Sequence, residues 1–313
     1  MNTYLIRQDI KIRKGDRSAQ ENDTFMKISK KTAAVLLIIV SALCFTGMNS
    51  CVRLSGDLPS LQKAFFRNFM AAIFAAVTLA KEHAPIKIQK GCGAAMLMRA
   101  VCGTVGVLCN FYAVDHLALS DASMLNKLSP FFTVVFSILI LKEKISLPQA
   151  AAIGAAFVGS LFIIRPTFSN MDLIPSIVGF TGGMGAGAAY TFVRYMKQRG
   201  ENSALIVFCF SMFSCTITLP FMIAGFVPMS PKQLAILLLA GLFAAGGQFA
   251  ITGAYTFAPA REVSVYDYSQ VIFSAITGFF LFGQMPVPLS IIGYVIIISA
   301  AVWTFFYNNK QTA

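Results

Sequence analysis

Ten apolar segments of membrane-spanning length follow one another along the chain, and this pattern limits the fold more than any other feature. A helix needs about 20 apolar residues to cross the ~30 Å hydrocarbon core of a bilayer. The connections are short and leave no room for a separate soluble domain. The sequence therefore predicts an all-α membrane protein with ten transmembrane helices, expected at residues 33–53, 62–80, 92–114, 121–141, 147–165, 173–196, 203–225, 233–256, 263–282 and 288–307.

The composition agrees with a membrane protein and argues against nucleic-acid binding. Hydrophobic residues make up 57% of the chain and charged residues 12%, whereas a soluble domain carries about 25% charged residues. The net charge of +12 comes from lysines and arginines that concentrate in the N-terminal segment and in some short loops. This distribution is typical of the positive-inside rule, and no basic patch is interleaved with exposed aromatic residues. We therefore expect contact with the lipid bilayer and no nucleic-acid partner.

The basic residues also predict the orientation. With the N-terminus inside, the cytosolic segments carry eighteen lysines and arginines, and the outside loops carry four, namely Arg53, Lys63, Arg165 and Lys232. Both termini are therefore predicted to be cytoplasmic, in a bacterial inner membrane. Residues 1–32 are expected to form a disordered basic tail, in which Met26 would also make a natural start, and residues 308–313 a short tail. The first apolar segment is followed by further spans and by no good cleavage site, which favours a span over a signal peptide.

The ten segments divide into two sets of five, expected at residues 33–165 and 173–307. Five is an odd number, so the second set must enter the membrane from the opposite side, which makes an inverted repeat. In a weak internal alignment, Asn126-Lys127 falls opposite Asp267-Tyr268 and Lys142-Glu143 falls opposite Gly283-Gln284. Repeated halves of this kind are typical of transporters whose substrate site lies between them.

An ordered set of short motifs resembles the drug/metabolite transporter superfamily, in particular its EamA-type ten-helix branch. The resemblance implies two inverted five-helix repeats, a central cavity, and transport, usually export, of small metabolites. One departure is Gly283-Gln284, where members often carry Gly-Glu, but this helix-end position puts no transport chemistry in doubt. The motifs that carry the resemblance are Ala64–Asn68, Arg99, Asn110–Ala113, Leu119–Ser123, Leu128–Phe132, Lys142–Ser146, Gly154–Gly159, Arg165-Pro166, Ala254-Tyr255 and Ala258–Ala260.

Polar side chains inside the spans are the candidates for substrate binding, because each is costly in hydrocarbon unless it is paired or hydrated. Counting about 1.5 Å per residue from the start of each span predicts two layers. The outer layer would hold Asn49, Arg67, Asn110, Tyr112, Asn126 and Lys127, and the inner layer Arg99, Tyr190, Arg194, Gln248, Tyr255, Tyr266, Asp267, Tyr268 and Gln270. The predicted substrate-binding residues are Asn110, Asn126, Lys127, Arg99, Tyr190, Gln248, Tyr266, Asp267 and Tyr268.

Lys127 and Asp267 each allow two interpretations. Lys127 could anchor a substrate carboxylate or phosphate, or it could extend to the outer headgroups. Asp267 could carry a proton or bind a substrate amine, or it could form a structural ion pair with Arg99 or Arg194. The alignment of the two positions favours function for both, since repeat-related positions meet near the cavity.

The other polar residues are weaker candidates. Arg67 and Arg99 are interpreted first as structural, with a substrate role as the alternative. The tyrosines could line the cavity or belong to an interfacial belt. Neither histidine lies in a span, so no histidine relay is expected.

Small residues and prolines predict how the helices pack. Gly179, Gly183 and Gly187 recur every four residues and would let a neighbouring helix approach closely. The same stretch fits a GxGxxA dinucleotide pattern, which carries no meaning inside an apolar span. Pro130 and Pro220 could kink their helices and free carbonyl groups for a cavity, or act as plain packing kinks.

The sequence favours a carrier over an enzyme or a scaffold. It contains no HExxH, Walker A or GxSxG motif and no His/Cys metal cluster, and its seven cysteines read as packing residues. We expect no catalytic residue, metal or cofactor. The leading hypothesis is a secondary transporter, and more specifically an exporter, of an amino-acid-like or other polar or amphipathic solute by alternating access. Proton coupling and a homodimer are left open, and the alternatives are a lipid flippase, a membrane enzyme or a membrane scaffold.

Overall fold

The computed structural model describes residue 30 and residues 32–83, 86–142, 146–164, 172–257 and 264–310, all helices and turns without a strand. Most of the predicted N-terminal tail, residues 311–313 and parts of several loops lie outside the described residues. The helices are Thr32–Leu54, α2 (Ser60–Lys81), α3 (Gly93–His116), α4 (Leu119–Asn126), α5 (Ser129–Leu141), α6 (Leu147–Ile164), α7 (Leu173–Lys197), α8 (Ser203–Ala224), α9 (Pro231–Phe257), the 3₁₀ helix η1 (Ser264–Tyr268), α11 (Ser269–Phe282) and α12 (Pro288–Lys310).

Seven helical stretches in the described residues are long and apolar enough to cross a membrane. They are Thr32–Leu54, α2, α3, the combined stretch Leu119–Ile140, α8, Pro231–Ile251 of α9 and Pro288–Tyr307 of α12. The other three predicted spans also coincide with helices. Of these, α7 is long but rich in glycine, whereas α6 and α11 have shorter apolar stretches.

The fourth predicted span is not one continuous helix. It ends at Asn126, turns through Lys127 and Leu128, and resumes at Ser129. Pro130 explains the break, because it lacks an N–H and its ring would clash with the carbonyl group of Asn126 four residues earlier. The prediction that Pro130 disturbs the helix is confirmed, but the result is an interruption and not a kink.

The ninth predicted span changes its helix type near the corresponding place. It begins as η1 and becomes α-helical only at Ser269. The fourth and ninth spans also end alike, because Lys142 after α5 and Gly283 after α11 adopt left-handed conformations with φ of 56° and 62°. This similarity agrees with the alignment of Lys142 with Gly283.

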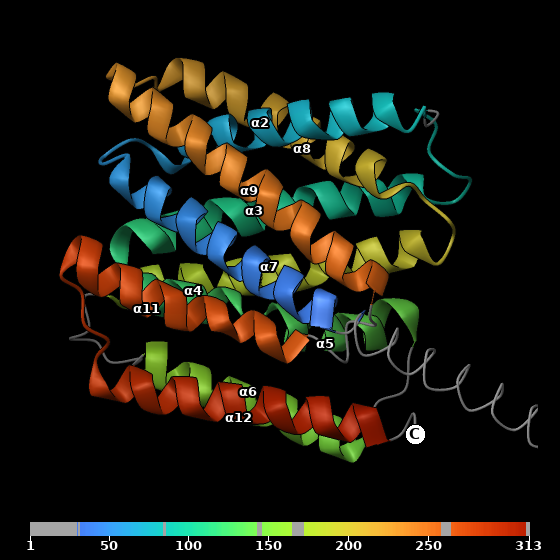
Figure 1. Ribbon diagram of the computed structural model, residues 1–313, viewed down its shortest axis with the longest axis vertical. Coiled ribbons are helices and arrows are strands. Elements are labelled where there is room, and N and C mark those ends of the chain that lie inside the picture. The colour runs from blue at the N-terminus through green and yellow to red at the C-terminus, as the bar shows by residue number, and fades with distance from the viewer. Residues whose placement is uncertain are drawn as a thin grey trace, which may run out of the picture.

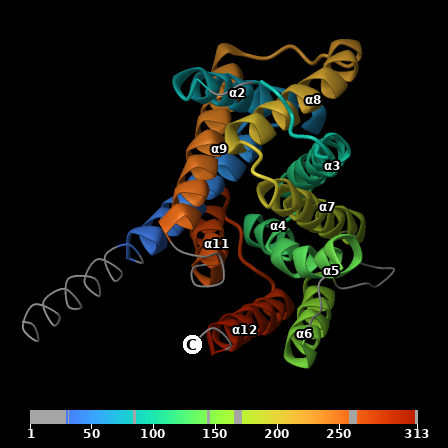
Figure 2. The same ribbon diagram turned by 90° about the vertical axis from the view of Figure 1, so that its right-hand side faces the viewer.

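The helices run side by side, with α2 and α8 at one edge of the bundle and α6 and α12 at the other (Figure 1). Between these edges lie two columns, which Figure 2 shows along the helix axes. We call α3, α7, α4 and α5 the α7 column. We call Thr32–Leu54, α9, η1 and α11 the α9 column.

The two columns are built alike. In the α7 column, α7 packs on α3 and α5. In the α9 column, Ser41 of the first helix donates to the Gly247 carbonyl of α9 at 2.9 Å, and Thr46 donates to the Gln270 carbonyl of α11 at 3.4 Å. The first helix of each five-helix set therefore packs on the third and fourth segments of the other set.

Equivalent spans of the two sets pack in antiparallel pairs. The contacts are α2 with α8, α4 of the fourth span with α11 of the ninth, and α6 with α12. In the α4–α11 pair, Ser123 bonds to Ser274 at 2.7 Å, and the Leu119 N–H donates to Gln284 Oε1 at 3.0 Å. Residue numbers thus rise along one helix as they fall along the other.

Glycines let α7 approach its neighbours on two sides. A Cβ added at Gly183 would lie 2.4 Å from the Leu125 carbonyl oxygen of α4, and one at Gly187 would lie 2.8 Å from that of Ser129. On another side, a Cβ at Gly185 would lie 3.0 Å from the carbonyl oxygen of Cys102 in α3. The predicted close helix approach is confirmed.

Loops predicted on the same side of the membrane meet at the same end of the bundle. Gln62 Nε2 donates to the Val227 carbonyl at 3.0 Å at one end. The Gln89 N–H donates to Glu201 Oε2 at 2.9 Å at the other. The described chain begins and ends toward the second of these ends (Figure 1).

One assignment needs correction. Lys63 is not a loop residue, because α2 begins at Ser60 and buries Lys63 completely, with its Nζ 2.6 Å from Asp115 Oδ1. The helix α12 continues to Lys310, three residues beyond the predicted end of the tenth span.

Candidate functional site

A buried ion pair joins the two columns where the break between α4 and α5 meets η1. Lys127 Nζ lies 2.5 Å from Asp267 Oδ2, and the two side chains are 8% and 14% exposed. Lys127 sits in the turn between α4 and α5, and Asp267 in η1. The Tyr268 hydroxyl donates to the Lys127 carbonyl at 3.1 Å. The turn releases that carbonyl from helical bonding, and the other column binds it.

Several expectations for this pair are corrected. Lys127 does not extend to the headgroups, and Asp267 pairs with it and not with Arg99 or Arg194. Lys127 and Asp267 also lie at one level, although they were predicted in different layers. The residue count failed because it treated each span as a continuous helix starting at the membrane surface, whereas the break between α4 and α5 meets the 3₁₀ helix η1 here.

The two arginines likewise lie at one level. The Arg99 guanidinium carbon is 4.2 Å from the centre of the Phe210 ring, and that of Arg67 is 5.9 Å from it. Both arginines are 9% exposed. Tyr190 lies within electrostatic range of both arginines and of Asp267, so these groups share one central region.

The other predicted site residues lie around this region or apart from it. Tyr190 of α7 and Tyr266 of η1 are 43% and 40% exposed. Asn110 is buried, and its Nδ2 donates weakly to Asn49 Oδ1 at 3.4 Å. Asn126 and Gln248 are half-buried. The Tyr255 side chain lies outside what the structure describes.

Two side chains were missed by sequence reasoning. Phe210 looked like any apolar residue, and only its contact with both arginines gives it significance. Asp121, a buried carboxylate in the first turn of α4, accepts a hydrogen bond from the Tyr294 hydroxyl of α12. A carboxylate in an apolar span is a signal that could have identified Asp121.

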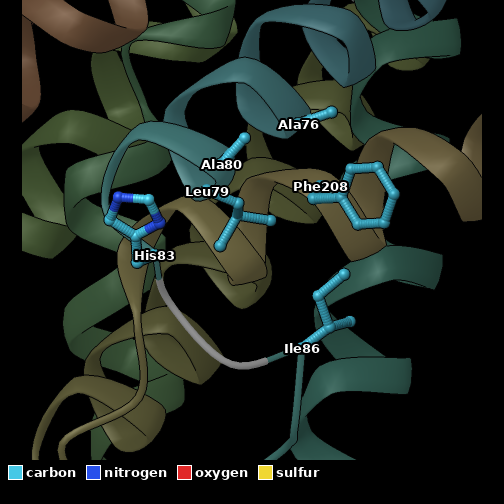
Figure 3. A pocket seen from close by; sticks show the side chains of 6 residues that line it. All are labelled: Ala76, Leu79, Ala80, His83, Ile86 and Phe208. Carbon is cyan, nitrogen blue, oxygen red and sulfur yellow. The ribbon is translucent and has the colours of Figure 1, made fainter.

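A surface groove lies away from the ion pair. It has a volume of about 400 Å³ and is lined by five apolar residues and His83 (Figure 3). It lies near the end of α2, beside Phe208 of α8, and contains none of the predicted site residues. Elsewhere in the described chain, no group of three histidine, cysteine or acidic side chains is placed to hold a metal ion.

The apolar helices and the buried charges between them define a multi-pass membrane protein. The EamA-like transporter family matches residues 32–165 and again residues 173–306. The chain belongs to this family of membrane transporters, and the resemblance read from its motifs is confirmed. The names of the family and of the relatives described below indicate transporters.

Curated relatives cover most of the chain. The pseudopaline exporter CntI of Pseudomonas aeruginosa strain UCBPP-PA14 is 29% identical over 272 residues, which are 86% of this chain and 95% of that protein. The S-adenosylmethionine uptake transporter of Rickettsia prowazekii is 23% identical over 261 residues, which are 81% of this chain and 85% of that protein. Relatives thus include both an exporter and an uptake transporter.

A similar fold has been solved. A crystal structure described only as that of a protein superimposes with a TM-score of 0.63 over 90% of this chain and 99% of that chain, at 11% identity. At this identity the similarity concerns the fold alone.

Proposed function

We propose that the protein is a secondary transporter that moves a small polar or amphipathic metabolite by alternating access. The observation that carries the proposal is the Lys127–Asp267 ion pair, buried between the two columns. Ionisable groups inside a membrane bundle are expensive and mark substrate or ion pathways.

The proposed topology is ten spans in two inverted repeats with both termini in the cytoplasm. The antiparallel pairing of equivalent helices supports inversion, because a parallel repeat would align such helices. The excess of basic residues in one set of loops supports the sidedness. In this topology α6, α7 and the η1–α11 segment also cross the membrane.

The ion pair supplies a means of coupling substrate or proton binding to movement of the two columns. Opening the contact between the columns would leave two buried charges without partners, which is strongly unfavourable unless each finds another. A substrate anion could satisfy Lys127, and a proton or a substrate amine could satisfy Asp267. Within the described residues, Asp267 Oδ1 has no hydrogen-bond partner and is available for this purpose.

The proposed direction is export. The pseudopaline exporter favours it, whereas the S-adenosylmethionine uptake transporter favours the opposite direction. A measurement must therefore detect movement either way.

The test is untargeted mass spectrometry of the medium of cells that overproduce the protein. Export predicts that at least one small metabolite rises in the medium, and uptake predicts that one falls. Either change should disappear in Asp267→Asn and Lys127→Ala. A lipid flippase would instead change lipid distribution without a soluble solute.

The matched control is Asp115→Asn. It breaks an ion pair of similar length, 2.6 Å, between α2 and α3. This variant should keep the wild-type change in the medium. If the Asp267 and Lys127 variants, produced at equal amounts, move the same solute at the wild-type rate, the ion pair has no part in transport.

A further inference from the structure

We propose that Arg67, Arg99 and Phe210 form an anion subsite that binds a carboxylate group of the transported solute. This inference rests on the proposed transport function and names the chemical class of the solute.

The subsite is assembled from three helices. Arg67 comes from α2, Arg99 from α3 and Phe210 from α8. The helices α2 and α8 both have 22 residues and pack antiparallel. Arg67 and Phe210 are each the eighth residue of their helix.

The two guanidinium groups have few partners. In the described part of the chain, Arg99 Nε and Nη1 and Arg67 Nε have no hydrogen-bond partner. Arg67 Nη1 donates to Asn68 Oδ1 at 2.6 Å, but Asn68 is neutral and itself donates to Ser214. No ion pair within the described residues involves either arginine.

Burial without a counter-ion makes this arrangement unfavourable. Each arginine is only 9% exposed, and each charge acts on the same small region. Stacking on an aromatic ring compensates for part of the hydration free energy that each guanidinium loses on burial. Two like charges that still lack a counter-ion are then satisfied best by an anion, whose interactions are strong in a poorly hydrated interior.

The chemistry of the two guanidinium groups also suits a small planar anion. Guanidinium groups bind carboxylates and phosphates through paired N–H donors. A Cβ at Gly103 would lie 2.0 Å from Arg99 Nη1 and 2.9 Å from the Phe210 ring, so the glycine leaves room for both.

The binding experiment uses detergent-purified protein and thermal unfolding. Succinate and glutamate are the probes, and 1,4-diaminobutane at equal ionic strength is the cationic control. Binding raises the unfolding temperature with concentration, so the two anions should stabilise the protein and the diamine should not. Arg67→Gln and Arg99→Gln should each raise the apparent dissociation constant at least tenfold.

Arg199→Gln is the matched control. Arg199 also stacks on an aromatic ring, that of Tyr195, at 3.6 Å, but it is exposed in a loop. Anion binding should remain unchanged in this variant. Arg99→Lys keeps the charge but not the paired donors and should retain only part of the affinity.

A second readout separates a binding role from a structural one. Without ligand, Arg67→Gln and Arg99→Gln should unfold at or above the wild-type temperature, because each removes a buried charge that lacks a counter-ion. A clear loss of stability in both variants would identify the arginines as structural and overturn the proposal.

The remaining outcomes distinguish a solute subsite from a lipid site and test the subsite separately from the transport proposal. No stabilisation by either anion, or equal stabilisation in both arginine variants, overturns the subsite and leaves the transport proposal standing. Arginine-dependent stabilisation by phosphatidylglycerol in phosphatidylcholine nanodiscs, without any effect of succinate or glutamate, assigns the site to a lipid headgroup and overturns the solute reading. Arginine-dependent binding of the anions without solute movement in the medium assay supports the subsite and overturns the transporter.

Discussion

At the scale of single residues, the most informative contacts join charges that are far apart in the sequence. Lys127 and Asp267 are separated by 140 positions, yet they form a 2.5 Å ion pair. Their alignment between repeats favoured a role for both near the cavity, although the residue count placed them in different layers. It did not predict the pairing, because side-chain contacts depend on where the helices break and cross.

Breaking this pair on one side should destabilise the protein. Asp267→Asn leaves Lys127 buried without a counter-ion, at an expected cost of about 3–5 kcal/mol. The double variant Lys127→Met/Asp267→Leu removes both charges and should recover most of that loss. Reversible unfolding in mixed micelles measures both values, and a double variant as unstable as Asp267→Asn would contradict the argument.

The hydroxyl of Tyr268 should contribute less. Tyr268→Phe removes one neutral hydrogen bond to the Lys127 carbonyl and should cost about 1 kcal/mol in the same assay. Phe keeps the ring, so a loss above about 3 kcal/mol would show that the hydroxyl does more than bind this carbonyl.

At the scale of helices, close packing depends on a few glycines. The glycine stripe of α7 predicted a close neighbour, and the structure identifies it as the α4–α5 segment. Pro130 predicted a disturbance, but no proline lies within η1, where the ninth span is a 3₁₀ helix. That change of helix type was not predictable from local sequence.

A methyl group at Gly183 should disrupt this packing. Gly183→Ala places a carbon 2.4 Å from a backbone oxygen that cannot move alone, and overpacking of this kind costs about 1–3 kcal/mol. Gly154→Ala in α6 is the control, because a Cβ there meets nothing within 4 Å. Helix propensity should stabilise that variant by up to about 1 kcal/mol. Equal unfolding temperatures for the two variants would refute the close-contact explanation.

At the scale of the whole molecule, each five-helix set makes the same contacts to the other set. The first helix of each set lies in the column of the other set (Figure 2). Each column therefore contains helices from both repeats, and motion of one column against the other would open the contact at Lys127 and Asp267.

Thiol labelling should reveal the sidedness of this bundle. In a background without the seven native cysteines, Asp57→Cys and Ser230→Cys should react with an impermeant reagent added to intact cells. Gln198→Cys and Lys87→Cys should react only after the membrane is permeabilised. The reverse pattern would place the termini outside, and reaction of all four in intact cells would refute the topology.

The sequence alone determined the class of protein, the repeated organisation and the family. These properties rest on the lengths of apolar segments and on short motifs, which are local and repeat along the chain. Only the tertiary structure decided which polar residues meet, including Lys127 with Asp267, and Arg67 and Arg99 on Phe210. Depth inside a membrane bundle depends on helix interruptions and crossings, and position along a span does not specify these.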